Sequence, residues 1–414
     1  MSRRLRIIVS AYACNPYQGS ERGVGWGWVN AIAQHHELWV LTDEVHRADI
    51  EKKIADAPER YGNLHFHYAP RTRWLILEKI WPPSYLWTYQ LWQKGAYKFA
   101  VKLHREIGFD LAHQLTYVGF RNPGYLWQLN IPFVWGPIGG LENTPWRFLP
   151  VLGLEGFIYY AARNIVNSLH KRFLTLPRRA FQKANGGIIA ATEGIRKEIL
   201  KWYGFDSEVI CEIGPPEIIA TEHSLRKPEE PLRLVWSGLH DPAKALPLLL
   251  NSAAILPKNI DWQLAILGSG VCTKKWQKLA LKLGINDRCT WHGWLPRNEA
   301  LNVVHKAHVF VITSLKDLTS TVLLEALSQG VPVICPDHCG FQNVVTEQCG
   351  IKVPVEKPSR LVSNIAGAII YLAENEHERR LLARGALDRI KGFSWERKSE
   401  LVDLIYKRVV LMYR

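Results

Sequence analysis

Short apolar runs alternate with longer amphipathic segments along this chain. The first run, Leu5–Ser10, is rich in β-branched residues, and a loop leads from it to a helical pattern between about Val24 and Gln34. Glu37–Thr42 then has the pattern of another buried strand. A strand, a helix and a strand in this order predict a parallel sheet with helices on both faces.

The same alternation continues through two halves of the chain. It is interrupted by Ile213–Pro216 and by the polar stretch Thr221–Pro231, which together predict a linker. Further strands are expected at residues 65–68, 110–113, 132–135 and 187–191 before the linker, and at 232–236, 263–267, 289–291, 309–312 and 331–334 after it. The last segment, Trp395–Tyr413, predicts a long amphipathic helix. The fold class is therefore α/β, with two doubly wound domains facing a cleft at the carboxyl ends of their strands.

Composition agrees with a folded chain of this kind. Its 414 residues suffice for two or three domains, and a hydrophobic fraction of 47% excludes wholesale disorder. The seven cysteines form no CxxC pair, so we expect free thiols in a reducing cytoplasm and no metal at Cys335 and Cys339. The apolar run after the basic start is short, and 18 consecutive apolar residues occur nowhere, so neither a signal peptide nor a spanning helix is expected.

The formal net charge of +14 is concentrated in one region, since 16 basic and 5 acidic residues lie between Arg60 and Lys183. Within this region, Arg71–Arg105 and Trp146–Lys183 interleave cations with aromatic residues. The tryptophans of the first stretch are Trp74, Trp81, Trp87 and Trp92. This mixture favours the surface of an anionic membrane, where aromatic rings settle at the headgroup level. The alternative is that the tryptophans are core residues beside solvated cations. No recognised nucleic-acid module is present, so nucleic acid is not expected as a partner.

The most informative segment is 309–330, where a buried strand leads through a polar loop into a helix. Thr319, Ser320 and Thr321 lie where the helix begins, and free amides there favour a phosphate. Asp317 and Glu325 on either side of that point could bind vicinal hydroxyls of ribose and a hexose. The alternative is that Asp317 or Thr319 only caps the helix and that Glu325 lies on the surface. Against it, Glu325 interrupts an apolar run, where an unpaired charge is costly.

The spacing Asp317-x7-Glu325, followed by Ala-Leu-x-x-Gly-Val-Pro-Val-Ile, resembles the signature of retaining GT-B glycosyltransferases of family 4, of the bacterial polysaccharide type. The family usually has Glu at the first position, so Asp317 is one carbon shorter. Further motifs resemble the family in the same order along the chain. They are Gly19–Gly23, Asp110–His113, Trp135–Gly140, Leu234–Gly238 with Lys244, Gly268-x-Gly270, Trp291–Trp294 and Gly350–Pro354.

The resemblance implies roles for matched positions. Asp317, Glu325 and His113 form the implied catalytic set, in which Asp317 contacts donor-sugar hydroxyls, Glu325 binds ribose and His113 orients the sugar. The alternative for His113 is a satisfied core histidine at a strand end. Lys244 would neutralise the leaving diphosphate. The implied donor site also contains Gly238, His240, Gly268, Trp294, Leu318, Thr319, Ser320 and Thr321. The implied acceptor or diphosphate loop contains Gly19, Ser20, Glu21, Gly23, Gly139 and Gly140.

One departure weakens the diphosphate site. The family's clamp Arg falls at Leu239, and His240 beside it is the only candidate to replace part of that charge. No convincing Asp-x-Asp motif is apparent, so neither a metal nor another cofactor is expected, and cationic groups with a helix terminus would hold the diphosphate.

These observations predict three parts: an acceptor-binding domain at residues 1–215, a donor-binding domain at 216–393, and a helix at 394–414 that packs back on the first domain. Both domains would be Rossmann-like, as in the GT-B fold. The expected activity is metal-independent, retaining transfer of a hexose from a nucleotide-diphosphate sugar to a lipid-linked or polysaccharide acceptor. The expected place is the cytoplasm, on the inner face of the cell membrane. The alternatives are a transferase with a small soluble acceptor and a catalytically silent GT-B scaffold subunit.

Overall fold

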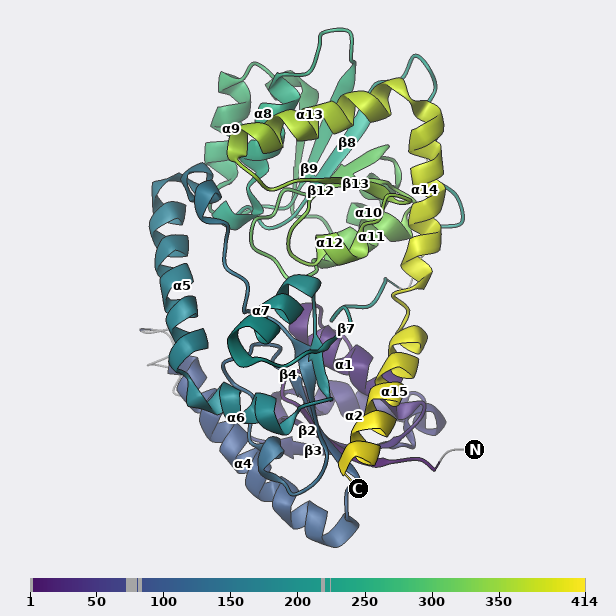
Figure 1. Cartoon of the computed structure of the whole chain (residues 1–414). Helices are drawn as coiled ribbons and strands as arrows, with labels where there is room; N and C mark the ends of the chain where they lie inside the picture. The colour runs from purple at the N-terminus through teal and green to yellow at the C-terminus, as the bar shows by residue number, and fades with distance from the viewer. Residues whose placement is uncertain (1–2, 72–79, 81–83, 217–219, 224, 414) are drawn as a thin grey trace. The chain divides into compact units, whose positions relative to one another are not determined.

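The computed structural model describes residues 3–71, 80, 84–216, 220–223 and 225–413, and it divides the chain into two compact units (Figure 1). The first unit comprises residues 1–141, 169–214 and 395–414. The second unit comprises residues 142–168 and 215–394. Each unit is built around one parallel sheet.

The first unit has a seven-stranded sheet in the order β3-β2-β1-β4-β5-β6-β7. Its strands are β1 Arg6–Ala11, β2 Glu37–Asp43, β3 Leu64–Ala69, β4 Leu111–Thr116, β5 Phe133–Ile138, β6 Ile188–Ala190 and β7 Glu208–Val209. Every residue of β4 and β5 is buried, as expected for central strands covered on both faces. The pattern analysis missed β7, because two residues at a sheet edge carry no hydrophobic period.

Helices cover this sheet on both faces. They are α1 Ser20–Ala33, α2 Arg47–Ala55, α4 Tyr85–Ile107, α6 Thr175–Lys183, α7 Glu193–Tyr203 and the C-terminal α15 Trp395–Tyr413. Helix α15 packs along α1, where the Trp395 ring occupies the space beside Gly27 and Gly214. Its Lys398 is buried and donates to the main-chain oxygens of Cys211 (2.8 Å) and Ile213. The last helix therefore belongs to the first unit and holds the segment that leads into the second.

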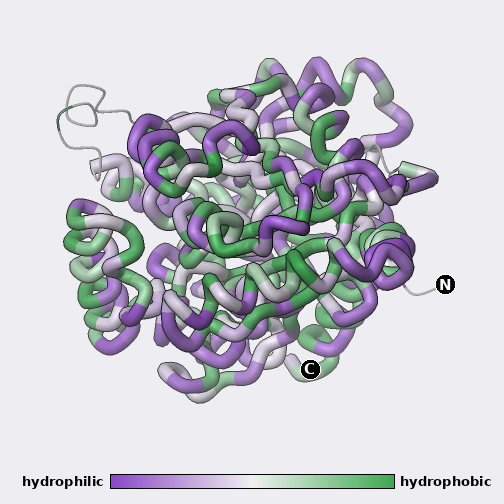
Figure 2. The backbone as a smooth tube through the Cα atoms, turned by 90° about the horizontal axis from the view of Figure 1, so that it is seen from above, coloured by the Kyte–Doolittle hydropathy of each residue, from purple (hydrophilic) through white to green (hydrophobic). Residues whose placement is uncertain are grey.

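The second unit has a six-stranded sheet in the order β10-β9-β8-β11-β12-β13. Its strands are β8 Leu232–Ser237, β9 Trp262–Leu267, β10 Cys289–Gly293, β11 Val309–Val311, β12 Val333–Pro336 and β13 Gly350–Val353. Its helices are α8 Leu246–Ala254, α9 Thr273–Lys282, α10 Arg297–His305, α11 Thr321–Ser328, α12 Phe341–Val344, α13 Pro358–Glu374 and α14 Glu376–Lys391. Strands β8, β11 and β12 are mostly or fully buried, and Figure 2 shows hydrophobic residues in peripheral coils of the chain as well.

Residues 142–168 correct the boundaries expected from the sequence, which assigned them to the first domain. They include the 3-10 helix Trp146–Leu152 and most of α5 (Gly153–Phe173), and they pack with the second unit. Phe148, Leu149 and Tyr160 join the hydrophobic core that covers the second sheet. Local periodicity shows that such residues are buried, but it does not show which sheet they cover.

The strand order reverses beside the first strand of each unit, between β1 and β4 and between β8 and β11. In open α/β sheets, ligands bind at the carboxyl ends of the strands next to this switch point. Across the part of the chain that the structure describes, no helix combines the length and apolar character needed to cross a lipid bilayer.

Candidate functional site

Lys244 and Asp317 meet at the switch point of the second sheet. Lys244 follows β8 and Asp317 follows β11, and their side chains form an ion pair in which both are less than one-fifth exposed (19% and 17%). Backbone contacts hold the two loops together, because the Leu315 amide donates to the Ala243 oxygen at 2.8 Å. The Thr313 hydroxyl also donates to the Lys244 main-chain oxygen at 2.8 Å. The fold thus places a cation and a carboxylate at the usual ligand-binding edge.

Glu325 lies one turn inside α11 and pairs with a residue that the sequence analysis did not select. Arg297 Nε lies 3.2 Å from Glu325 Oε1, at the first residue of α10. Burial raises the pKa of Glu325, and the nearby Arg297 opposes this shift. Glu325 is therefore a mostly buried carboxylate with a charged partner. The position of Arg297 just after the Trp291–Trp294 segment is the only sequence signal that could have pointed to it.

The N-terminus of α11 directly follows Asp317. Ser320 precedes the helix with φ +74° and makes no side-chain capping bond. The first N–H groups of a helix have no partner within it, so they can bind an anion. The Leu318 amide donates to Asp317 Oδ1 at 3.0 Å, so in this structure it binds the Asp317 carboxylate. Thr319 is buried and packs against Gly340, whereas Thr321 is exposed at the first turn.

Glycine residues bring the loops after β8, β9 and β10 close together. Gly268 has φ +101°, and a Cβ there would lie 2.0 Å from the Gly238 oxygen. The Gly268 amide donates to the Gly293 oxygen at 2.7 Å. Only glycine permits this approach of main chains at the strand ends. Trp294 follows directly and is exposed, which leaves its ring accessible at the same edge.

Lys316 ties the same loop to residues that the sequence placed in the other domain. Its ammonium donates to the main-chain oxygen of Glu142. Glu142 precedes α5, whose Asn167 also reaches that oxygen at 3.5 Å. Residues 142–168 therefore support the loop that carries Asp317.

The first unit has a related arrangement at its own switch point. Glu21, in the first turn of α1, accepts a hydrogen bond of 2.6 Å from the Val118 amide after β4. Burial raises the pKa of Glu21. The Gly139 amide after β5 donates to the Val118 oxygen at 2.6 Å. The start of α1, the loop after β4 and the end of β5 therefore meet at this point.

The remaining residues of the predicted glycine loop support this geometry. Gly23 packs so closely that a Cβ would lie 2.7 Å from the Gln18 oxygen, whereas one at Gly19 would meet nothing within 4 Å. Ser20 has φ +55°, and Gly140 follows Gly139 with φ +84°. The turn into α1 is therefore tight at Gly23 and open at Gly19.

A cavity of about 680 Å³ opens beside this edge, between β3 and α4. Aromatic and aliphatic side chains line most of it, and Arg47, Glu51 and His67 supply polar groups. The Arg47 guanidinium lies 4.3 Å from the centre of the Tyr68 ring. Its size falls within the range of small-molecule sites. The sequence analysis did not select these residues, because they come from separate elements and form no motif.

Comparison with known proteins places this geometry in a known class. Residues 218–388 match the model of the family described as "Glycosyl transferases group 1". Most of the second unit is therefore similar to a glycosyltransferase group 1 domain. A D-inositol 3-phosphate glycosyltransferase from Saccharomonospora viridis is 26% identical over 211 residues, which cover 48% of this chain and 48% of that protein. The chain thus spans about half the length of this curated relative.

Solved structures extend the likeness to the whole chain. The apo form of the lipopolysaccharide outer core galactosyltransferase WaaB is 16% identical with a TM-score of 0.66, over 97% of this chain and all of that one. Anabaena HepE in complex with UDP-glucose is 12% identical with a TM-score of 0.54, over 99% of both chains. At these identities the likeness concerns the fold. The chain has the two-domain GT-B fold that the sequence predicted.

Two histidines with implied roles, His113 and His240, are buried in this structure. His113 is fully buried, with Nε2 2.8 Å from the Gly136 oxygen and Nδ1 2.6 Å from the Tyr406 hydroxyl. Because a carbonyl only accepts, Nε2 carries the proton and Nδ1 accepts from Tyr406. Burial lowers the pKa of His113 to about 4. Both ring nitrogens of His113 thus have partners within the fold, and its contact with the sugar stays a prediction.

His240 does not replace the missing Arg of the GT-B clamp. Its side chain is buried among Trp236, Trp276 and Trp291, and Nδ1 lies 2.8 Å from the Thr273 hydroxyl. Burial lowers the pKa of His240, so the ring is neutral at pH 7. Leu239 is exposed where the clamp Arg would stand. The structure instead supplies a second cation at this edge through Arg297.

Proposed function

We propose that this chain is a glycosyltransferase that moves a hexose from a nucleotide-diphosphate sugar to a hydroxyl of a glycan or lipid-linked acceptor. The observation that carries the proposal is the Lys244–Asp317 pair at the switch point of a glycosyltransferase group 1 domain. The group 1 match and the GT-B fold support the reaction class. The donor base and sugar, the acceptor and the linkage are for the experiments below to identify.

The donor would bind at the carboxyl edge of the second sheet. Lys244 would turn from Asp317 to the diphosphate oxygens, and the exposed first turn of α11 would supply further amides. Asp317 would then accept from hydroxyls of the sugar. Glu325, held by Arg297, would accept from the two ribose hydroxyls. The exposed Trp294 would stack on the base.

During transfer, the bond between the anomeric carbon and the diphosphate oxygen breaks with its electron pair on that oxygen. A bond to the acceptor oxygen forms, and the acceptor proton would pass to an oxygen of the leaving diphosphate. Negative charge therefore grows on the leaving diphosphate, where Lys244 is placed to balance it. Resemblance to family 4 supports retention of the anomeric configuration. We further propose that transfer needs no metal, so EDTA should leave the rate unchanged. Loss of transfer in EDTA, with recovery on adding Mg²⁺, would overturn this part.

The acceptor would bind at the first unit. Glu21 is a buried carboxylate at its switch point, and the cavity beside β3 offers aromatic surfaces together with Arg47 and Glu51. Aromatic faces with a few polar groups suit a sugar or the first part of a lipid. We place the reaction in the cytoplasm at the inner surface of the cell membrane.

A thermal-shift panel of UDP-, GDP- and ADP-sugars tests donor binding directly. UDP-glucose comes first, because the HepE structure contains it. A ligand at 100 times its dissociation constant stabilises a protein by about 2.7 kcal/mol, which is visible as a raised Tm. No shift with any nucleotide sugar would contradict the proposal. The shorter Asp317 and the exposed Leu239 favour the alternative of a catalytically silent scaffold. Slow hydrolysis of the donor in the absence of an acceptor would show that the chain is an enzyme and not such a scaffold.

A further inference from the structure

Helix α5 presents its apolar side chains outward. Five of them recur at spacings of four or seven residues along one face and are between 49% and 76% exposed. These residues, named here the α5 stripe, are Leu154, Ile158, Ile165, Leu169 and Phe173. Successive positions at these spacings lie on one face of a helix. The α5 stripe is therefore one continuous apolar surface.

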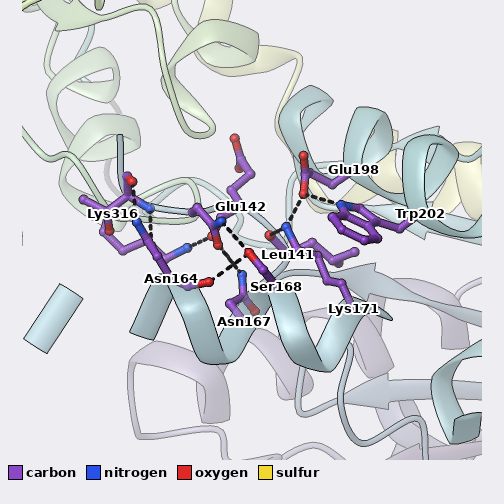
Figure 3. Close-up of polar contacts among 11 residues, drawn as sticks. Leu141, Glu142, Asn164, Asn167, Ser168, Lys171, Glu198, Trp202 and Lys316 are labelled. Carbon is purple, nitrogen blue, oxygen red and sulfur yellow. Dashed lines mark hydrogen bonds and ion pairs between the residues drawn. The ribbon is translucent and has the colours of Figure 1, made fainter. Parts of the chain in front are cut away.

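The opposite face of α5 is buried, with Tyr160 in the core of the second unit and polar side chains from residue 164 onward. Asn164 accepts from the Thr144 amide at 3.0 Å and donates to the Thr144 oxygen at 2.8 Å. Asn167 donates to Asn143 Oδ1 at 2.8 Å, and Lys171 pairs with Glu198 and donates to the Leu141 oxygen at 3.0 Å. Figure 3 shows these side chains directed toward the segment around Glu142 and toward Glu198.

This arrangement is the reverse of an ordinary surface helix, which turns its apolar face inward and its polar face to water. The polar contacts fix the orientation of α5, because rotating the helix would leave buried Asn and Lys groups without partners. The α5 stripe is thus held outward by the structure. Large contiguous apolar surfaces of this kind mark contacts with a membrane or a protein.

Charge distinguishes between these two occupants. The charged residues exposed on α5 are Arg163, Arg172 and Glu155, and the surrounding segment 60–183 carries 16 basic against 5 acidic residues. Arginines beside an apolar face suit a helix lying in the interface of an anionic bilayer, each contributing roughly 1 kcal/mol. The apolar surface and the positive charge therefore both favour an anionic bilayer as the partner.

We propose that α5 lies on an anionic bilayer with the α5 stripe among the acyl chains. This inference rests on one part of the proposed function, namely that the acceptor is presented at a membrane surface. It also changes the residues expected from the sequence. Trp92 of the stretch 71–105 is buried, Trp87 is exposed, and Trp74 and Trp81 lie outside the described residues. The apolar face of α5, which lies in the stretch 146–183, would make the contact, rather than the tryptophans of the stretch 71–105.

Flotation with vesicles of phosphatidylcholine and phosphatidylglycerol in about equal parts tests the proposal. Wild-type protein should float at low salt, and the double variant Ile158→Glu/Ile165→Glu should bind at least about tenfold more weakly. The matched control is Val271→Glu/Leu281→Glu, since both residues are exposed apolar side chains of the second unit outside the α5 stripe. It should float like the wild type. Equal flotation of all three proteins would overturn the proposal.

Two further measurements complete the test. Unchanged thermal shifts with nucleotide sugars in Ile158→Glu/Ile165→Glu would show that donor binding and folding are intact, so failure of docking is distinguishable from failure of the proposed activity. Sedimentation without vesicles tests a protein occupant. A wild-type dimer that the same substitutions dissociate, together with no flotation, would assign the α5 stripe to a second copy and overturn the bilayer.

Discussion

Lys244 and Asp317 are 73 residues apart in the chain, and their side chains form an ion pair at the switch point of the second sheet. Each follows one of the two adjacent strands β8 and β11. The pair is what a diphosphate with an attached sugar would need: a cation that can change partners and a carboxylate that is then released to accept hydroxyls. Four predictions test this site and its surroundings.

Lys244→Ala should reduce transfer or donor hydrolysis by about 100-fold, the usual loss when a group that stabilises developing charge is removed. The measurement is steady-state release of nucleoside diphosphate. Lys258→Ala is the control, because this exposed lysine precedes β9 and so lies at the opposite edge of the sheet. A Lys244→Ala rate within a few fold of the wild type would remove Lys244 from the diphosphate site.

Asp317→Ala should abolish most turnover while the protein stays folded, with a loss of stability of about 3 kcal/mol because the pair that it breaks is mostly buried. Asp317→Glu introduces the longer side chain of the signature that this segment resembles, and it should keep at least part of the activity. Turnover and Tm are measured for both variants. If Asp317→Ala turns over like the wild type, the carboxylate has no role in sugar binding.

Donor affinity should fall on acidification, since the Glu325 carboxylate must be ionised to accept two ribose hydroxyls. Burial raises the pKa of this group, so the loss should begin above the pH at which an ordinary glutamate titrates. Arg297→Ala removes the opposing charge, and it should move the midpoint to still higher pH. Calorimetric titration across pH measures this shift. Arg288→Ala, which breaks an exposed pair with Asp261, should leave the midpoint in place.

Tyr406→Phe should destabilise the protein by about 1–3 kcal/mol without changing donor affinity, because it removes the hydroxyl that donates to the buried His113. Urea unfolding and nucleotide-sugar titration provide the two readouts. Tyr413→Phe on the same helix is the control, since that hydroxyl is exposed. If Tyr406→Phe instead changed donor affinity strongly and left stability unchanged, His113 would have a role in binding the sugar.

Much of the fold could be predicted because buried parallel strands leave a strong local signal. Leu5–Ser10 and Glu37–Thr42 were expected as strands and correspond to β1 and β2 within a residue or so at each end. The residues Asp317 and Glu325 could be selected because their motif lies in one segment. Arg297 and the cavity beside β3 could not, since their partners come from separate elements that only folding brings together.

His113 and His240 show a second limit. Their positions next to strand ends favoured ligand contacts, but burial and occupied ring nitrogens make His113 a core residue and leave His240 uncharged. Desolvation depends on every atom packed around a side chain. The residue type and its neighbours in sequence therefore do not determine its charge.

The two α/β halves, the excess of positive charge in residues 60–183 and the selected residues of the candidate donor site could be predicted from local periodicity, composition and motif spacing. That residues 142–168 pack with the second unit, and that α5 turns its apolar stripe outward, became visible in the folded chain alone. The physical reason is that an amphipathic pattern gives two faces without saying which is buried. On α5, hydrogen bonds from Asn164, Asn167 and Lys171 determine that choice.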